Sequence, residues 1–351
     1  MERIAYIELD THAEIAGNFM ELMKDSEQFS VDYYFSPKIF KQIGTNSQRV
    51  FEIRPEDLLA VLKDEKYALV IIGTVHRYFD LFFKVTGQFN TSVIVHNLNF
   101  TKISSLQLLE NVFKKDFTYR LKLLFKEDLL SAPKVFEKAA NLLVLDESLL
   151  KTNPQSKLYS LPVFFVNEYE SERNSNITVV IPGAVSQERR NYRHLLERIK
   201  TFSGKRHFQI VFLGKAAGKE LQWLKNFEKD KLQNISLKYF TEKVPQQLFD
   251  EWMQKADVLW CPLQPKTEFF SQKEYYGKTK LSGNLGDAIK YGKIAVFPSD
   301  YPNSNRFIIP EHENVEDQLY TLTKVTAYDF KEKYAKEKVL KTLEETLRKF
   351  L

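Results

Sequence analysis

The sequence predicts an α/β fold built from two successive parallel sheets, each with helices on both faces. Short apolar runs rich in β-branched residues alternate with longer amphipathic runs along the whole chain. This alternation is typical of βαβ units, whose parallel strands are buried between helices. A chain of 351 residues is also longer than one compact core usually serves, so two domains are expected.

The first domain is expected over residues 1–165. Amphipathic patterns at 13–25 and 55–65 predict helices, and Pro55 followed by two acids favours a helix N-terminus. Six apolar runs predict its strands: IAYIEL (4–9), VDYYF (31–35), VFEI (50–53), ALVIIG (68–73), SVIVH (92–96) and NLLVLD (141–146).

The same alternation of apolar and amphipathic runs begins again after a polar segment, VNEYESERNSN (166–176), which we interpret as a linker. A second domain is therefore expected over residues 177–325. The tail, residues 326–351, has apolar residues near helical spacing and predicts one long charged helix crossing a domain face. The strands of the second domain are predicted at TVVIPG (178–183), FQIVFLG (208–214), ISLKYF (235–240), VLWCPL (258–263) and IAVFPS (294–299).

Composition narrows the class of protein. The chain has 51 basic and 46 acidic residues, and this small surplus gives no reason to expect nucleic acid as a partner. The single cysteine, Cys261, excludes an internal disulfide framework. No signal peptide or membrane span is evident, so a cytoplasmic protein is expected. No metal-ligand pattern or cofactor motif is evident either.

The stretch YYGKTKLSGNLGDAIKYG (275–292) places three glycines and two lysines before a predicted helix. Glycine lets a ligand approach the backbone, and a helix N-terminus offers free N–H groups and a positive dipole end. Together with the lysines these groups suit a diphosphate. The alternative is a solvated loop that caps a core helix. The candidate diphosphate ligands in this stretch are Lys278, Lys280, Ser282 and Gly283.

Six stretches of the chain, in this order, resemble one enzyme family. They are SVIVHNLNF (92–100), ANLLVLDESLLK (140–151), IPGAVSQERRNYRHLLE (181–197), FQIVFLGKAAGKELQWL (208–224), ADVLWCPL (256–263) and GDAIKYGKIAVFPS (286–299). The set is similar to retaining glycosyltransferase family four, whose members have the GT-B fold of two Rossmann-like domains. The resemblance implies metal-independent transfer of a sugar from a nucleotide-diphosphate sugar. The acceptor would be a glycan or a lipid-linked molecule in the interdomain cleft, for example in surface polysaccharide synthesis.

The resemblance also implies roles for single residues. Arg190 stands where the family usually has a phosphate-binding lysine, although Arg189 and Arg193 compete for that role. Asp287 would accept hydrogen bonds from the donor ribose, or it is simply an acid near a helix N-terminus. The remaining expected wall residues of the donor pocket are Gly183, Gly214 and Thr279.

Three histidines follow predicted strands, at the edge where ligands gather in such sheets. They are His12, His76 and His96, and His96 also matches the family motif. His96 and His12 are the candidate catalytic residues, and the alternative for each is a structural histidine. His194, His207 and His312 are expected at the surface.

One departure from the family pattern opens a different hypothesis. Thr279 occupies the position of a family glutamate that contacts the transferred sugar. The protein could therefore be a catalytically silent nucleotide-sugar-binding or scaffold protein of the same fold. An epimerase or a phosphorylase of the same architecture is a further alternative.

The segment NVFKKDFTYRLKLLFK (111–126) mixes lysines and Arg120 with apolar side chains. A single basic amphipathic helix here could rest on an anionic membrane as a peripheral contact. The alternative is a core-facing helix with a solvated outer face.

Overall fold

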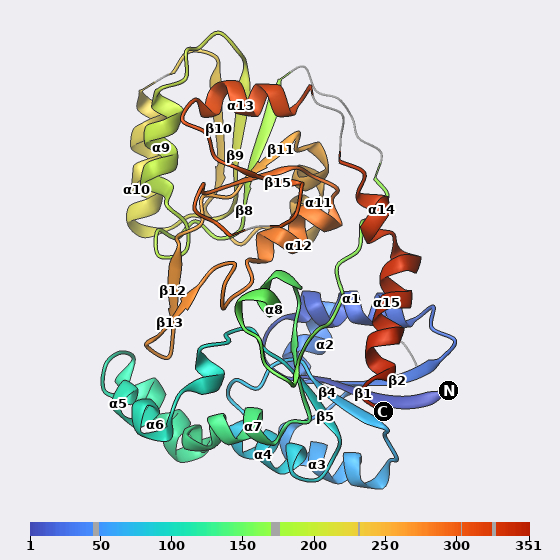
Figure 1. The fold of residues 1–351 in the computed structure, drawn as a ribbon. Coiled ribbons are helices and arrows are strands. Elements are labelled where there is room, and N and C mark those ends of the chain that lie inside the picture. Colours follow the sequence, from blue (N-terminus) through green and yellow to red (C-terminus); the bar gives the residue numbers. More distant parts are fainter. Residues whose placement is uncertain (45–48, 170–175, 231, 303, 325–327) are drawn as a thin grey trace.

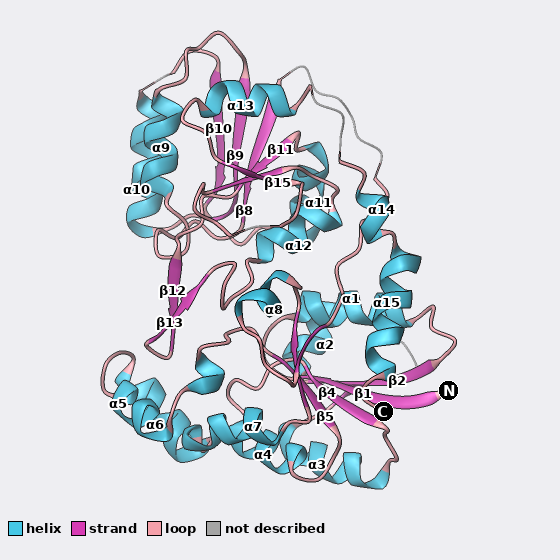
Figure 2. Cartoon of the chain, in the orientation of Figure 1, coloured by secondary structure: helices cyan, strands magenta, loops and turns pink. Residues whose placement is uncertain are grey.

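The computed structural model describes residues 1–44, 49–169, 176–230, 232–302, 304–324 and 328–351. They form two parallel sheets, one in each half of the chain, with helices on both faces of each sheet (Figures 1 and 2). The predicted fold class is therefore confirmed. Most of the expected linker, residues 166–176, lies outside the described residues.

The first sheet has the order β3-β2-β1-β4-β5-β6-β7, with every pair parallel. Its strands are β1 (Glu2–Glu8), β2 (Phe29–Phe35), β3 (Val50–Glu52), β4 (Leu69–Ile72), β5 (Thr91–Ile94), β6 (Asn141–Val144) and β7 (Leu158–Ser160). The helices of this half are α1 (Ala13–Met23), α2 (Pro37–Ile43), α3 (Pro55–Asp64), α4 (Phe79–Thr86), α5 (Ser105–Val112), α6 (Phe117–Lys126), α7 (Ala132–Lys138) and α8 (Ser148–Thr152). The sequence did not predict β7, because three residues are too few for a periodic pattern.

The second sheet has the order β10-β9-β8-β11-β14-β15, again all parallel. Its strands are β8 (Ile177–Pro182), β9 (Phe208–Lys215), β10 (Ile235–Phe240), β11 (Val258–Trp260), β14 (Ala295–Phe297) and β15 (Ile308–Pro310). The helices of this half are α9 (Tyr192–Lys200), α10 (Gly218–Lys229), α11 (Gln246–Lys255), α12 (Gly283–Lys290) and α13 (Val315–Leu322).

Alternation along the central strands explains why both faces of each sheet are covered. In β1, Ala5 and Ile7 join the core formed with α3, α4 and α7, whereas Ile4 and Tyr6 join the core on the opposite face. Successive strand side chains point to opposite faces, so a strand apolar at every position needs helices on both sides.

The tail is two helices, and the prediction of one long helix is wrong. α14 (Phe330–Tyr334) and α15 (Lys336–Arg348) are separated by Ala335, whose ψ of 138° is not helical. Phe330 packs in the core of the second sheet, and Leu343 is fully buried in the core of the first. The tail therefore crosses from one half to the other (Figure 1). No helix in the described part of the chain is long and apolar enough to cross a membrane.

The segment 111–126 is also not the single helix predicted from sequence. α5 ends at Val112, and α6 begins after Asp116, whose φ of 49° breaks the helix. Arg120 is buried rather than solvated, because its guanidinium donates hydrogen bonds to the Asn111 carbonyl and to Ser271 and lies over the Phe270 ring.

An antiparallel hairpin, β12 (Lys266–Phe269) and β13 (Gln272–Tyr275), reaches from the second half onto α5 and α6 of the first (Figure 1). At its tip Phe270 is buried in the core of the first half. Nearer its base the buried carboxylate of Glu274 accepts hydrogen bonds from the backbone N–H groups of Asn99 and Phe100, at 3.2 and 2.9 Å. The hairpin thus fixes one half of the molecule against the other.

Candidate functional site

Two adjoining cavities lie between the two halves of the molecule. We name them by wall residues that distinguish them: the arginine cavity, of about 540 Å³, contains Arg189 and Arg190, and the aspartate cavity, of about 1070 Å³, contains Asp287. Both are walled by residues from both halves of the molecule. The residues that line both cavities are His12, Glu14, Val95, His96, Lys280, Leu281 and Gly283.

The glycine-rich stretch places the start of α12 at this junction. The Ser282 side chain caps the helix by accepting a hydrogen bond from the Asn284 N–H at 3.3 Å. A Cβ added at Gly283 would meet no atom within 4 Å, so its backbone faces open space. The Gly283 N–H also has no hydrogen-bond acceptor among the described residues. A free N–H at a helix N-terminus is a suitable ligand for an anion.

The other glycines of the stretch serve the fold. Gly277 has a φ of 75°, in the left-handed region that favours glycine. A Cβ added at Gly286 would lie 2.6 Å from the Phe164 ring. Of the three glycines that the sequence associated with a ligand, Gly283 lines both cavities, Gly286 lines the aspartate cavity and Gly277 lines neither.

Lys280 extends from the same loop across the interface, where its Nζ donates a hydrogen bond to Asn97 Oδ1 at 2.6 Å. Burial lowers the pKa of Lys280 to about 8, against the opposing effect of the Glu274 carboxylate. Lys278 is exposed and is not a wall residue of either cavity. The structure therefore brings one of the two candidate lysines to the junction.

Thr279 lies in the turn before α12 and faces neither cavity. Its hydroxyl accepts a hydrogen bond from the Tyr275 N–H at 2.9 Å, and its carbonyl accepts one from the Leu98 N–H at 2.9 Å. The position of the family glutamate is thus occupied by a residue that ties the loop to the first half.

Arg190 reaches the arginine cavity from the loop after β8. Its guanidinium donates to Asn284 Oδ1 at 3.1 Å and to the Ala184 carbonyl at 3.3 Å. Arg189 lines the same cavity, is exposed, and has no side-chain partner among the described residues. Arg193 lies elsewhere, with its guanidinium 4.7 Å from the centre of the Trp223 ring.

Gly183 and Gly214 shape the floor beneath Arg190. Gly183 has a φ of 99°, and a Cβ there would lie 2.5 Å from the Arg190 guanidinium. A Cβ at Gly214 would lie 2.3 Å from the Gly183 carbonyl oxygen. Neither glycine lines a cavity directly, so both act by letting the loop and the arginine pack closely.

Asn284, which the sequence analysis did not single out, connects these groups. It is buried, accepts from Arg190, and donates to the Pro182 carbonyl and to Asp287 Oδ2, both at 3.2 Å. Burial raises the pKa of Asp287 to about 6, although the hydrogen bond from Asn284 opposes this effect. The only sequence signal was its place in the first turn of a helix inside the glycine-rich stretch.

His12 and His96 meet at the junction from the ends of β1 and β5. Their rings stack with centroids 3.7 Å apart and planes within 11°. His96 Nε2 lies 2.9 Å from the Gly73 carbonyl oxygen, which can only accept, so Nε2 carries the proton. Burial lowers the pKa of His12 to about 4 and that of His96 well below its ordinary value. Both imidazoles are therefore neutral near pH 7.

The other histidines differ in setting. His76 lines the arginine cavity, its Nε2 is 3.1 Å from the Tyr119 hydroxyl, and burial lowers its pKa to about 4. His194 is partly buried and bonds to Glu311 on the second half. In the described part of the chain no group of three or more His, Cys, Asp or Glu side chains is arranged to hold a metal ion.

No family model matches the sequence, and no curated protein is similar to it at a significant level. Solved structures do match over nearly the whole chain. The lipopolysaccharide outer core galactosyltransferase WaaB is 13% identical with a TM-score of 0.56, covering 99% of this chain and 100% of WaaB. The pneumococcal O-GlcNAc transferase GtfA, solved with UDP and GlcNAc, is 13% identical with a TM-score of 0.57, covering 99% of each chain.

An epimerase shares the same architecture. The UDP-GlcNAc 2-epimerase from Neisseria meningitidis, solved with UDP-GlcNAc, is 10% identical with a TM-score of 0.52, covering 99% of this chain and 100% of the epimerase. At these identities the likeness establishes architecture alone. Two parallel-sheet domains facing each other across a cleft, matched end to end by these structures, show that this chain has the GT-B fold.

Proposed function

We propose that the protein transfers a sugar from a nucleotide-diphosphate donor to a glycan or lipid-linked acceptor, in surface polysaccharide synthesis. The observation that carries the proposal is the convergence of the Gly283 N–H, the Lys280 ammonium and two neutral histidines at the junction of two cavities. A leaving diphosphate gains negative charge, which a fixed N–H and a cation stabilise. Fold relatives solved with UDP or UDP-GlcNAc support a donor of this class.

The two cavities suit the two ends of such a donor. The aspartate cavity offers Asp287 to ribose hydroxyls and the side chains of Val244, Phe249 and Tyr291 to a base. The diphosphate would lie at the junction, against Gly283 and Lys280. The sugar would then enter the arginine cavity beside the stacked histidines.

In the proposed reaction the bond between the anomeric carbon and the diphosphate oxygen breaks, and its electron pair leaves with the nucleoside diphosphate. A new bond forms between the anomeric carbon and an acceptor hydroxyl oxygen. His12 or His96 would accept the hydroxyl proton: each is neutral near pH 7 and has an unprotonated ring nitrogen, although its lowered pKa makes it a weak base in the free protein. Arg189 supplies a free guanidinium for the phosphate, and Arg190 holds Asn284 and the loop in place.

Calorimetry with UDP, GDP, ADP and the corresponding nucleosides tests the donor site. Lys280→Ala should weaken diphosphate binding by about 1.5–3 kcal/mol, the range for a hydrogen bond to a charged group. Gly283→Val should weaken it further, and Arg189→Ala should affect the diphosphate more than the nucleoside. Equal losses for nucleoside and diphosphate, or no loss, would show that the loop serves the fold alone.

A silent nucleotide-sugar-binding protein remains the second candidate, because Thr279 brings no carboxylate to the cleft. The nearby Glu274 does not replace it, since its oxygens are bonded to backbone N–H groups. Tight binding of a nucleotide sugar without hydrolysis or transfer would favour this candidate over the transferase.

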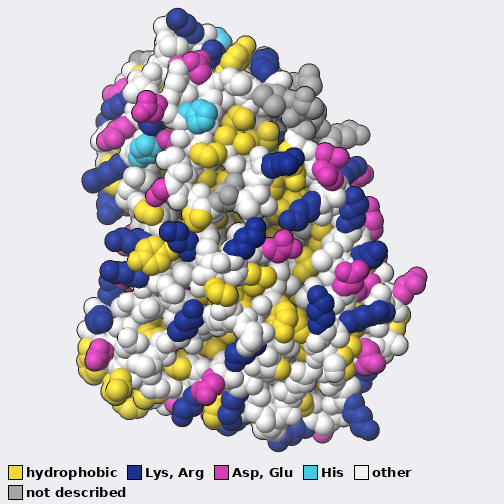
Figure 3. Space-filling model, viewed as in Figure 1, with side chains coloured by type: hydrophobic (Ala, Val, Ile, Leu, Met, Phe, Trp, Pro, Cys, Tyr) yellow, Lys and Arg dark blue, Asp and Glu magenta, His cyan; other side chains and the backbone are white. Residues whose placement is uncertain are grey.

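We also propose a peripheral contact with the inner face of the cytoplasmic membrane through α5 and α6. Most of the exposed large apolar side chains among the described residues lie there, and Figure 3 shows apolar and basic side chains together at that end of the molecule. Lysines beside them complement anionic lipids. The exposed apolar residues of this surface are Leu106, Leu109, Phe113, Phe117, Tyr119 and Phe125, and its exposed lysines without an ion-pair partner in the described part of the chain are Lys114, Lys122 and Lys126.

Replacing Lys114, Lys122 and Lys126 together by glutamate should abolish sedimentation with vesicles of phosphatidylglycerol and phosphatidylcholine. Lys115 is left unchanged because it pairs with Glu268 on the hairpin at 2.8 Å. The matched control reverses three exposed lysines of α10, Lys219, Lys225 and Lys229. If both triple variants sediment like the original protein, the membrane contact is wrong.

A further inference from the structure

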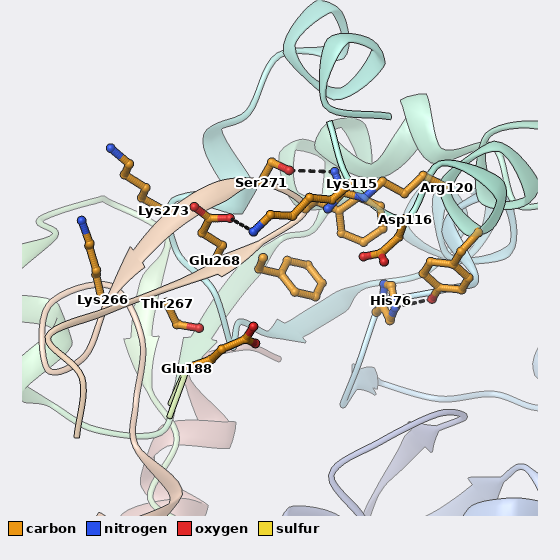
Figure 4. Close-up of a pocket in the computed structure, with 13 residues that line it drawn as sticks. His76, Lys115, Asp116, Arg120, Glu188, Lys266, Thr267, Glu268, Ser271 and Lys273 are labelled. Atoms are coloured by element: carbon orange, nitrogen blue, oxygen red, sulfur yellow. Dashed lines mark hydrogen bonds and ion pairs between the residues drawn. The ribbon is translucent and has the colours of Figure 1, made fainter. Parts of the chain in front are cut away.

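A third cavity, of about 670 Å³, lies between the hairpin β12–β13 and α6 (Figure 4). We name it the hairpin cavity. It adjoins the arginine cavity, with which it shares four wall residues: His76, Thr267, Glu268 and Phe269. A molecule lying in it therefore has one end at the place where the donor sugar is expected.

The walls of the hairpin cavity are held by contacts that do not involve a ligand. Phe270 is anchored in the core of the first half, and the Asn111 side chain donates a hydrogen bond to its carbonyl at 2.9 Å. Ser271 accepts from Arg120 at 2.8 Å, and Glu268 pairs with Lys115, as the dashed lines in Figure 4 show. Such a site is preorganised, so little ordering cost opposes binding.

The chemistry of the walls combines aromatic rings with hydrogen-bonding groups. His76, Tyr119, Phe269 and Phe270 contribute rings, and His76 lies edge-on to both phenylalanines with centroids 5.3 and 5.5 Å away. Glu188 and Lys266 line the cavity without a hydrogen-bond or ion-pair partner among the described residues. Thr267 adds a hydroxyl, and Asp116 points toward the same space as His76 (Figure 4).

This combination selects among ligand classes. An acyl chain would leave the carboxylates and lysines desolvated without partners, which is costly. The walls carry both signs of charge, so a polyphosphate near Lys266 and Lys273 would also meet the carboxylates of Asp116 and Glu188, which repel it. A sugar fits, because the C–H face of a pyranose packs on an aromatic ring while its hydroxyls donate to carboxylates and accept from lysines.

We propose that the hairpin cavity binds the terminal sugar rings of a carbohydrate acceptor. This inference rests on the proposed function and makes it more specific, since the acceptor end would be a glycan whether or not a lipid carries it. The acceptor hydroxyl would pass His76 and Thr267 into the arginine cavity. The hairpin of the donor-binding half would thus form one wall of the acceptor subsite.

Saturation-transfer NMR in the presence of UDP tests the subsite. The probes are the p-nitrophenyl glycosides of glucose, galactose and N-acetylglucosamine, together with maltose, lactose and chitobiose. Two variants change wall residues that line the hairpin cavity alone: Tyr119→Ala removes a ring, and Glu188→Trp fills space. Gln272→Ala is the matched control, because it lies on the same hairpin outside the cavity wall.

At least one glycoside should bind the original protein and the Gln272→Ala control. Its affinity should fall about tenfold or more in Tyr119→Ala and in Glu188→Trp, a loss of about 1.4 kcal/mol. UDP affinity, measured by calorimetry, should be the same in all four proteins. Glycoside binding that is unchanged in both variants, or absent from the original protein while UDP binds, overturns the subsite. Glycoside binding without any nucleoside diphosphate binding would support the subsite and contradict the proposed function.

Discussion

Gly283 and Gly286 stand one turn apart in α12, yet the space around them differs. A Cβ at Gly283 enters the open junction of the cavities, whereas a Cβ at Gly286 meets the Phe164 ring at 2.6 Å. We therefore expect Gly286→Ala to lower the free energy of unfolding by about 1–3 kcal/mol, the usual cost of overpacking. Gly283→Ala should leave it within about 0.5 kcal/mol, as expected for an exposed site. Urea denaturation of the two variants measures both values.

The same two variants should differ in the opposite order when nucleoside diphosphate binding is measured: Gly283→Ala should be affected more than Gly286→Ala. Gly283→Ala should weaken UDP binding, because its methyl group lies where a phosphate must approach the N–H. A folded Gly286→Ala protein should lose less UDP affinity than Gly283→Ala, because its methyl group points at the Phe164 ring and not at the proposed phosphate position. If one variant shows both the larger loss of stability and the larger loss of UDP affinity, the two glycines do not have separate roles.

Lys280 gives the donor site a pH dependence. Its pKa of about 8 means that the side chain is charged at pH 7 and loses its proton as pH rises toward about 9. The terminal phosphate of UDP, with a second pKa of about 6, is already mostly ionised at pH 7, so UDP affinity should fall as Lys280 loses its proton. Lys280→Arg should remove this fall, since arginine stays protonated. Calorimetry across this range on both proteins is the check, and equal slopes would exclude Lys280 as the cause.

The role of a residue could be predicted only where a short sequence pattern indicates it. The helix that follows the glycine-rich loop was predicted, and it begins at Gly283, but the cap formed by Ser282 was not predicted. The role of Asn284 was not predicted either, since its partners Pro182 and Arg190 come from a different element. Arg190 was predicted to grip phosphate, but its bonds also brace the loop, a role that no single-sequence pattern reveals.

The hairpin β12–β13 belongs to the second half of the molecule and packs its tip into the core of the first half. Phe270→Ala should lower the free energy of unfolding by about 3–5 kcal/mol, because a buried ring leaves the core of the first half. Tyr275→Ala, at the more exposed base of the hairpin, should cost much less. Hydrogen exchange at residues 97–112 should rise in the first variant alone. Equal exchange in both variants would contradict the anchoring role of Phe270.

The sequence did not predict this hairpin, and its turn explains why. Phe270 and Ser271 form a two-residue turn in which both φ values are positive, 51° and 58°. Turns of this kind usually contain Asn-Gly or a similar pair, which can be recognised in a sequence. A phenylalanine in the left-handed region is strained, and here its burial in the neighbouring domain offsets that strain.

The strands and helices of both domains were largely predictable, because burial on both faces leaves continuous apolar runs. The way in which the two domains meet was not predictable. His12, His96, Lys280 and Asp287 come together only because the strand ends of two domains face each other, and no periodicity reports that approach. The resemblance to a known fold predicted that the two domains enclose a cleft, and the stacking of the two histidines became evident only from the structure.

The central claim is that the molecule cleaves the bond between sugar and diphosphate of a nucleotide sugar bound in its interdomain cleft. The most direct measurement is release of nucleoside diphosphate from a panel of UDP-, GDP-, ADP- and TDP-sugars, followed by chromatography. We expect release from at least one donor, increased by a glycoside that binds the hairpin cavity and lost in a Lys280→Ala, Gly283→Val double variant. No release from any donor that the original protein binds, or equal release by the double variant, would contradict the claim.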